Sequence, residues 1–296
     1  NPEIERYFKT VKFVPNKSLT TFVKVNQLYD MDNFLFRNIF AGSDKFLPPN
    51  LQNNATSLEA LTRIGLKSQI NGDTFIECAQ EVESQIIQNR FSISLIKIRA
   101  KELILYMYEH IETLDFDDEQ LEQILDIKFV LSDKNLPVQF YQSPKETSGF
   151  ETFGNICRQE YKKICWTQCP IFDKSIEPTA LFNEYYPEIG IPCTESIINH
   201  WFFVAENIES WKSSKNEKKI KSVIKNIYES MIERSDESDL IESNISDPKK
   251  KLFLNDENPF DKNNCVAGKE LIIGDDFKGV KEFLMPYEEL LFLAGA

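Results

Sequence analysis

The residues of this chain with the clearest chemical potential are four cysteines near its middle, Cys157, Cys165, Cys169 and Cys193. Thiolates bind zinc, and structural zinc sites usually draw on two pairs of cysteines, with about two to four residues between the members of a pair. Cys165 and Cys169 have this spacing, but the sequence offers no second pair. We therefore expect these cysteines to be buried free thiols, without a structural zinc ion.

The chain has six cysteines in 296 residues, too few and too scattered for a disulfide scaffold. It has two histidines, His110 and His200, and each lies within an apolar stripe at helical spacing. A histidine in such a place is usually a satisfied core or boundary residue. We expect neither to act as a general base or metal ligand.

Motifs for nucleotide chemistry are absent from the sequence. None of the ten glycines forms a Gly-x-Gly, so the dinucleotide fingerprint and the glycine-rich phosphate loop are both missing. No nucleophile elbow is present. Carboxylate pairs such as Asp117-Asp118 and Asp275-Asp276 are interpreted as helix caps or turns. The sequence therefore predicts no catalytic residue and no cofactor.

The formal net charge of −13 disfavours nucleic acid as a partner, because phosphate backbones are bound by dense basic patches. The exception is the segment from Lys212 to Lys225, where apolar residues at helical spacing alternate with lysines. These lysines are most simply the solvated face of an amphipathic helix. The alternative is a patch that binds an anionic partner, with Lys218, Lys219 and Lys221 as candidate interaction residues.

Hydropathy predicts a chain that does not enter a membrane. No apolar run approaches the roughly 20 residues that span a bilayer. The sequence at the start, Asn1 to Arg6, lacks the layout of a signal peptide. We expect a cytoplasmic location.

Three segments predict pairs of short strands. "VKFVPNKSLTTFVKV" (Val11 to Val25) has two β-favouring runs around a polar turn, which is typical of a hairpin. The pattern recurs in "KFVLSDKNLPVQFYQ" from Lys128 and more weakly from Lys251 to Gly274. The chain therefore reuses a strand-turn-strand module between helical blocks.

Helical periodicity and capping patterns predict the remaining elements. The first is a helix that is capped at Thr56 and ends at Gly65. Two long helices follow, with apolar stripes from Phe75 to Ile86 and from Ile93 to Ile111; Asp73 caps the first, and a break near Asn89 to Ser92 separates them. A short helix capped at Asp117 comes next, and an αα-hairpin is formed by Ile197 to Trp211 and the lysine-rich helix. Ser235 to Lys251 is expected to be a flexible loop.

Together these elements predict a predominantly helical α+β fold, in which short β-hairpin or sheet modules pack on long helices and on the αα-hairpin. We expect two domains. Residues 1–115 would hold the N-terminal hairpin and a helical module. Residues 116–296 would hold the second hairpin, the αα-hairpin and a C-terminal strand and helix module.

The stretch "LYDMDNFLFRNIFAGSDKFLPPNL", Leu28 to Leu51, is interpreted as a structural joint. Phe34, Ile39 and Phe40 would lie on a packing face, together with Leu28 and Phe36, and Asp30 would accept hydrogen bonds in a turn. Pro48-Pro49 would form a rigid exit. Alternatively, Tyr29 is a surface contact residue, because tyrosine combines apolar area with a hydroxyl group.

The order of motifs along the chain resembles the repeated segments of the sacsin family. It runs "KFVP", "LYD", "FLPP", "LEALTRIGLK", "KFVL", "CWTQCPIF", "GIP" and "FLMPYEELLFLAGA". Each motif alone is weak, and their order over nearly the whole chain carries the resemblance. One departure is Met31, where the family often has proline after the aspartate.

The resemblance implies a segment that follows an ATPase-like region similar to the nucleotide-binding domain of ninety-kilodalton heat-shock chaperones. That region's Asp-x-Gly turn and glycine-rich lid are missing here. The implied function is a non-catalytic structural and protein-interaction segment of a giant neuronal co-chaperone that organises intermediate filaments of the cytoskeleton. Its implied partners are neighbouring repeats, client proteins and the seventy-kilodalton heat-shock system. A ligand-binding or enzymatic domain with a site assembled from distant residues is the alternative.

We predict that the chain neither binds nor hydrolyses ATP, because it lacks the glycine-rich and Asp-x-Gly elements that hold phosphates and magnesium. Calorimetric titration of the chain with ATP, with and without magnesium, should give no saturable heat. Saturable binding at micromolar ATP would overturn this expectation.

Overall fold

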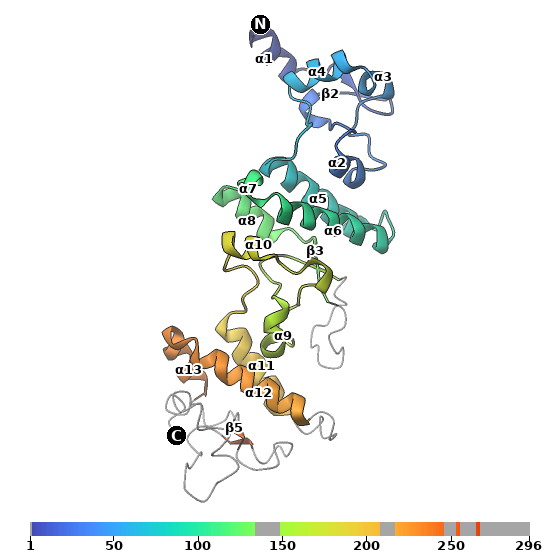
Figure 1. Ribbon diagram of the computed structural model, residues 1–296. Helices are drawn as coiled ribbons and strands as arrows, with labels where there is room; N and C mark the ends of the chain where they lie inside the picture. The colour runs from blue at the N-terminus through green and yellow to red at the C-terminus, as the bar shows by residue number, and fades with distance from the viewer. Residues whose placement is uncertain (1, 134–148, 208–216, 246–252, 255–264, 267–296) are drawn as a thin grey trace, which may run out of the picture. The chain divides into compact units, whose positions relative to one another are not determined.

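The computed structural model describes residues 2–133, 149–207, 217–245, 253–254 and 265–266 (Figure 1). Within these ranges the fold is predominantly helical α+β, as predicted, with three antiparallel sheets of two strands each. The chain separates into two compact units. Unit 1 holds residues 1–132, 148–154 and 175–187, and unit 2 holds residues 133–147, 155–174 and 188–296. The expected modules 1–115 and 116–296 differ from these units, because the strands near Val130 belong to unit 1.

Unit 1 consists of helices and two of the small sheets. Its elements are α1 (Pro2–Thr10), β1 (Val14–Pro15), β2 (Phe22–Val23), the 3-10 turn η1 (Val25–Gln27), α2 (Phe34–Ile39), α3 (Pro49–Gln52), α4 (Ala55–Arg63), α5 (Gly72–Gln88), α6 (Ile93–Glu109), α7 (Ile111–Leu114), α8 (Asp118–Asp126), β3 (Val130–Leu131), β4 (Phe150–Glu151) and α10 (Ala180–Tyr185). The turn η4 (Lys174–Ile176) begins in unit 2 and ends in unit 1.

The two long helices α5 and α6 lie side by side in unit 1 (Figure 1). The predicted break between them is confirmed, since Asn89 ends α5 in a left-handed conformation with φ 50° and Ser92 caps α6. The predicted stripes are buried from Phe75 through Val82 and from Ile96 through Met107. Ile93, at the first position of α6, is exposed instead.

Two predicted helix caps were wrong by two residues. Helix α4 is capped by Asn54, whose side chain accepts the N–H of Ser57, and α5 is capped by Asn71. Asparagine is as favourable an N-cap residue as serine or aspartate, so Asn54 and Asn71 cap these helices in place of Thr56 and Asp73. Gly65 follows α4 with φ +115° as expected, and the predicted capping box of Asp117 with Gln120 opens α8.

The predicted strand pairs are confirmed at both ends of the chain. Strand β1 pairs with β2, with Val14 opposite Val23, and β5 (Phe253–Leu254) pairs with β6 (Cys265–Val266). In the middle of the chain, β3 (Val130–Leu131) pairs with β4 at Phe150–Glu151, a pairing that the sequence did not predict. The segment expected to pair with β3 lies in residues 134–148, outside the described residues.

Unit 2 contains the predicted αα-hairpin. Its elements are the 3-10 turn η3 (Gln159–Tyr161), α9 (Lys162–Cys165), α11 (Thr194–Asn207), α12 (Glu217–Ile232), the 3-10 turn η6 (Ser235–Glu237), α13 (Ser238–Ile245), β5 and β6. Helices α11 and α12 pack together, and α9 packs on both. The loop predicted from Ser235 was wrong as far as residue 245, because η6 and α13 form there and Ile241 is buried.

No helix in the described part of the chain is long and apolar enough to cross a membrane.

Helix α2 divides the phenylalanines of the Leu28 to Leu51 stretch between core and solvent. Asn33 caps this helix and accepts the N–H groups of Leu35 and Phe36. Phe36, Ile39 and Phe40 are buried, but Phe34 at the first helical position is 58% exposed. The expected packing face is therefore confirmed except at Phe34. A helix that begins there turns its first residue to solvent.

We predict that Phe36→Ala or Phe40→Ala lowers the free energy of unfolding by about 3–5 kcal/mol, because each removes a buried ring. Phe34→Ala is the matched control in the same helix, and its effect should stay within about 0.5 kcal/mol. Urea unfolding of the three variants measures the difference. Equal losses at Phe34 and Phe36 would contradict the burial pattern.

Candidate functional site

The first candidate site lies around Tyr29 in unit 1, and we call it the joint. It consists of the Leu28–Asp30 segment, the neighbouring segments at Lys45 and Lys67, and the helices α2 and α5 that contact them. Tyr29 forms parallel bridges with Phe46 and with Lys67. Its N–H donates to the carbonyl of Lys45 at 2.9 Å, and the N–H of Asp30 donates to the carbonyl of Lys67 at 2.8 Å. The segment is therefore held by backbone hydrogen bonds along both of its edges.

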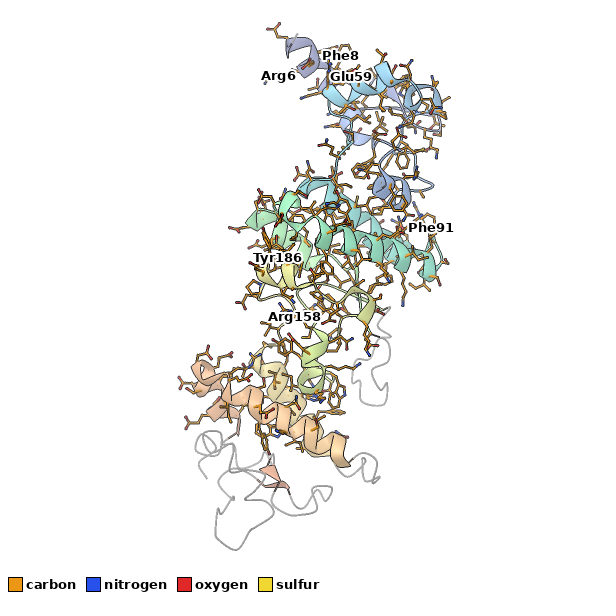
Figure 2. The ribbon with its side chains drawn as sticks, viewed as in Figure 1. Arg6, Phe8, Glu59, Phe91, Arg158 and Tyr186 are labelled. Atoms are coloured by element: carbon orange, nitrogen blue, oxygen red, sulfur yellow. The ribbon has the colours of Figure 1, made fainter. Side chains whose placement is uncertain are left out.

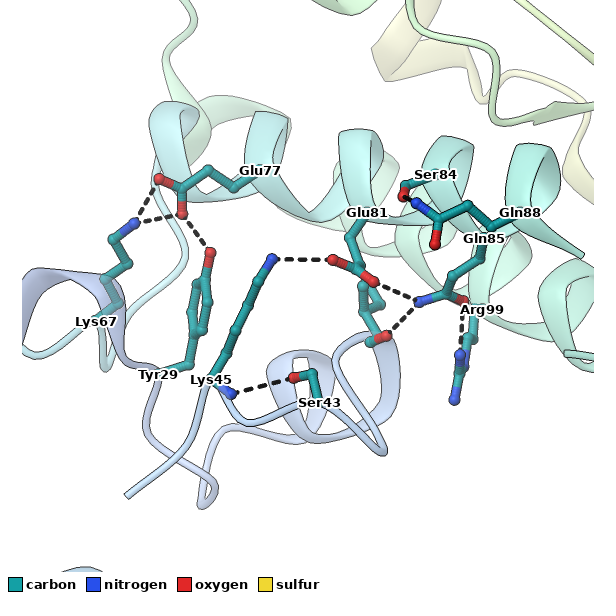
Figure 3. Close-up of polar contacts among 11 residues, drawn as sticks. Tyr29, Ser43, Lys45, Lys67, Glu77, Glu81, Ser84, Gln85, Gln88 and Arg99 are labelled. Atoms are coloured by element: carbon teal, nitrogen blue, oxygen red, sulfur yellow. Dashed lines mark hydrogen bonds and ion pairs between the residues drawn. The ribbon is translucent and has the colours of Figure 1, made fainter. Parts of the chain in front are cut away.

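The side chain of Tyr29 lies inside unit 1, where it is 4% exposed. Its ring stacks on Phe40 with centroids 4.1 Å apart, and its hydroxyl group donates to Oε2 of Glu77 at 2.7 Å (Figure 3). Burial raises the pKa of Tyr29, and the hydrogen bond to Glu77 raises it further. The structure thus places Tyr29 in a packed position, away from the exposed surface that an interaction role would use.

Glu77 of α5 joins the joint to the long helix. Its carboxylate binds the ammonium group of Lys67 through both oxygens, with 2.6 Å from Nζ to Oε2 (Figure 3). The same ammonium group lies 5.1 Å from the centroid of the Tyr29 ring. Glu77 therefore bonds both to the hydroxyl group of Tyr29 and to the ammonium group of Lys67, which lie on two neighbouring segments.

A second set of polar contacts fixes the end of α2 to α5. Nε2 of Gln85 donates to the carbonyl of Ile39 at 2.8 Å, and Oε1 of Gln85 accepts from Arg99 at 2.6 Å (Figure 3). Arg99 is 2% exposed, its burial lowers its pKa, and its guanidinium group lies 4.3 Å from the ring of Phe91, labelled in Figure 2. The contacts satisfy the buried amide of Gln85 and Nη1 of Arg99, whereas Nε of Arg99 is buried without a hydrogen-bond partner among the described residues.

Asp30 accepts hydrogen bonds in a turn, as the sequence predicted. One of its oxygens, Oδ1, accepts the N–H of Asp32 at 2.9 Å and the side-chain amide of Gln52 at 2.7 Å. Pro49 occupies the first position of α3 after Pro48, which confirms the rigid exit. These hydrogen bonds hold the loops of the joint in place.

The second candidate site is a cluster of three thiols in unit 2, the Sγ atoms of Cys157, Cys165 and Cys169. These atoms all lie within 4.8 Å of one another. Cys165 ends α9, and the N–H of Cys169 donates to the carbonyl of Cys165 at 2.9 Å. The described cysteines form no disulfide bond, and Cys157 and Cys165 are buried as expected, but Cys169 is partly exposed and Cys193 is exposed. The gathering of the three thiols in one place is a feature that the spacing did not predict.

Hydrogen bonds within the thiol cluster favour one thiolate. Donation from the thiols of Cys157 and Cys165 lowers the pKa of Cys169 to about 3. The contacts of Cys165 with Cys157 and Cys169 raise the pKa of Cys165. The arrangement therefore favours the thiolate form at Cys169 over Cys165.

His200 of α11 supports the turn that carries Cys165 and Cys169. Its Nδ1 lies 2.7 Å from the hydroxyl oxygen of Thr167, and its Nε2 lies 3.2 Å from the carbonyl of Lys163. Burial lowers the pKa of His200 to about 3, so the ring is neutral. The expectation of a satisfied core histidine is confirmed. His110, half-buried at the junction of α6 and α7, is a boundary residue.

The remaining candidate interaction residues, Lys218, Lys219 and Lys221, lie in α12. Their side chains fall outside the described residues. Their role stays a prediction.

We predict that Tyr29→Phe lowers the free energy of unfolding by about 1–2 kcal/mol, because it removes the hydrogen bond to Glu77 and keeps the ring stack. Tyr7→Phe is the control, since Tyr7 is 64% exposed. Urea unfolding of both variants makes the comparison. A Tyr29→Phe variant as stable as Tyr7→Phe would show that the hydroxyl group does not hold the joint.

Comparisons of the chain with protein-family models, with curated proteins and with solved structures find no match. The resemblance to sacsin repeats therefore rests on the order of short motifs alone.

Proposed function

We propose that this chain is a non-catalytic structural and protein-interaction segment of a sacsin-like co-chaperone, acting in the cytoplasm in protein folding and intermediate-filament organisation. The observation that carries the proposal is the bonding of Glu77. Its carboxylate binds both the hydroxyl group of Tyr29 and the ammonium group of Lys67. A carboxylate committed in this way orders the joint and is a poor general base.

The partners that fit this proposal are neighbouring repeats of the same protein, client proteins and, by the resemblance, the seventy-kilodalton heat-shock system. The net charge of −13 supports protein partners over nucleic acid. A structural segment of this kind needs an ordered surface that presents apolar side chains.

The β1–β2 hairpin of unit 1 has such a surface. Leu19 is 67% exposed and Phe22 is 63% exposed. The loop between the strands is ordered by the buried side chain of Asn16, which accepts the N–H groups of Thr20 and Thr21 at 3.0 and 3.3 Å. The hairpin therefore holds its shape without burying its two largest apolar side chains.

We predict that the chain suppresses the aggregation of heat-denatured citrate synthase, and that the double change Leu19→Asn with Phe22→Thr weakens this effect. Asparagine tolerates the positive φ of Leu19, 60°, and threonine suits a strand, so unfolding should change by less than about 0.5 kcal/mol. Light scattering of the client and a thermal melt of each variant measure the two effects.

Ile87→Gln is the matched control, because Ile87 is 73% exposed on α5, away from the hairpin in sequence. It should leave client protection unchanged. A parent chain without protection would contradict the proposed function. Equal protection by the parent and the double variant would exclude the hairpin as the contact.

A further inference from the structure

The three sulfur atoms of the thiol cluster come from two parts of unit 2 that differ in structure. Cys165 and Cys169 flank a tight turn at the end of α9, whereas Cys157 lies in an extended segment that bridges to Ile171. Their Sγ atoms lie within 4.8 Å of one another. In a tetrahedral zinc site, Zn–S bonds of about 2.3 Å place the sulfur atoms about 3.8 Å apart. The cluster would close on zinc by movements of about 1 Å or less.

The spacing of these cysteines predicts no structural zinc ion, but their gathering in the fold reverses that expectation, and we infer that Cys157, Cys165 and Cys169 bind a zinc ion, with Cys193 as the fourth ligand. Thiolates without a carboxylate select zinc over calcium or magnesium, which take oxygen ligands. Each ligand that carries a proton as a thiol releases it to solvent when the Zn–S bond forms. The inference is independent of the proposed function.

Cys193 is assigned as the fourth ligand because its side chain is exposed and because it directly precedes α11, whose His200 contacts the turn of Cys165 and Cys169. Its Sγ lies 3.1 Å from the hydroxyl oxygen of Ser196, which lies four residues before His200 on α11.

His200 does not serve as a ligand, because both of its ring nitrogens are engaged. They contact the hydroxyl oxygen of Thr167 and the carbonyl of Lys163, which belong to the turn and to α9. His200 is therefore a positioning residue. It fixes the backbone that carries Cys165 and Cys169.

The backbone of Cys157 is fixed from the other side. Its N–H donates to the carbonyl of Pro170 at 2.8 Å, and the next N–H, of Arg158, donates to the carbonyl of Gly190 at 2.9 Å. Gly190 has φ +83°, and a Cβ there would lie 2.7 Å from Cγ of Arg158, labelled in Figure 2. The close approach requires glycine. The ligand positions are thus held in place before any metal binds.

Local charge favours a thiolate site at this place in an acidic chain. The segment between Cys157 and Cys165 carries three basic residues, Arg158, Lys162 and Lys163, against one acidic residue, Glu160, and Lys162 also pairs with Asp133. Four thiolates with one zinc ion have a net charge of −2, which nearby cations stabilise.

The test measures metal in the full chain. Protein purified under reducing conditions without chelator should contain one zinc per chain by mass spectrometry. After chelator treatment it should bind one cobalt ion, with the charge-transfer absorption of tetrahedral cobalt thiolate. Cys165→Ser with Cys169→Ser should abolish both signals. Cys78→Ala should keep them, because Cys78 is a buried thiol of α5 in unit 1.

Cys193→Ser should retain cobalt but bind it about tenfold or more weakly. An affinity and a spectrum equal to the parent would overturn the assignment of Cys193. The cobalt titration of the parent needs no variant, so misfolding of a variant does not affect it. No zinc and no cobalt absorption in a parent whose six cysteines all react as free thiols in denaturant would overturn the site. A count of four reactive thiols would overturn it in favour of a disulfide.

Discussion

Both units depend on one constraint, which is that a polar group removed from water must find a partner within the protein. In unit 1 the constraint acts on the Leu28–Asp30 segment, whose backbone lies between the segments of Lys45 and Lys67 and bonds to both. Once this backbone is placed, Tyr29 points into the core and its hydroxyl group needs an acceptor. Glu77 supplies it from α5. The joint and the long helix are therefore fixed together by this hydrogen bond and the ion pair of Lys67 with Glu77, with further contacts from Lys45 to Glu81 and from Ile39 to Gln85.

Unit 2 meets the same constraint with His200. A neutral imidazole has one donor and one acceptor. Thr167 and the carbonyl of Lys163 complement them. Because the two partners flank Cys165 in sequence, satisfying the histidine also shapes the turn in which the thiols meet. The positions of the sulfur atoms are thus a consequence of hydrogen bonding elsewhere in the turn, and the cluster stands on a rigid backbone.

The sequence predicted what local patterns determine. The β1–β2 hairpin, the break at Asn89 and the Asp117 capping box each depend on residues close together in the chain, and all three are present. The sequence did not predict features that depend on residues distant in the chain or on the residue at which a helix begins. Helix α2 begins at Phe34, and the ring of Phe34 is therefore exposed to solvent. The partner of β3 lies near residue 150, and no periodicity carries that information. The thiol cluster was missed for the same reason, because spacing rules count neighbours in sequence and Cys157 arrives through its bridge to Ile171.

The two units also differ in how their local cores are filled. Around the β1–β2 hairpin of unit 1, the buried cluster consists of aliphatic side chains, Val14, Val25, Leu28, Leu47, Leu61 and Leu66. In unit 2, the cluster beside α9 has Cys157, Cys165 and Ile171 at its centre, with Tyr161, Trp166 and Cys169 partly buried around them. At about 25 cal/mol per Å² of buried apolar surface, thiol-bearing side chains gain less than leucines. Small cores commonly depend on a cross-link for the stability that apolar burial does not supply. A metal joining residues 157, 165 and 169 would supply such a cross-link beside α9.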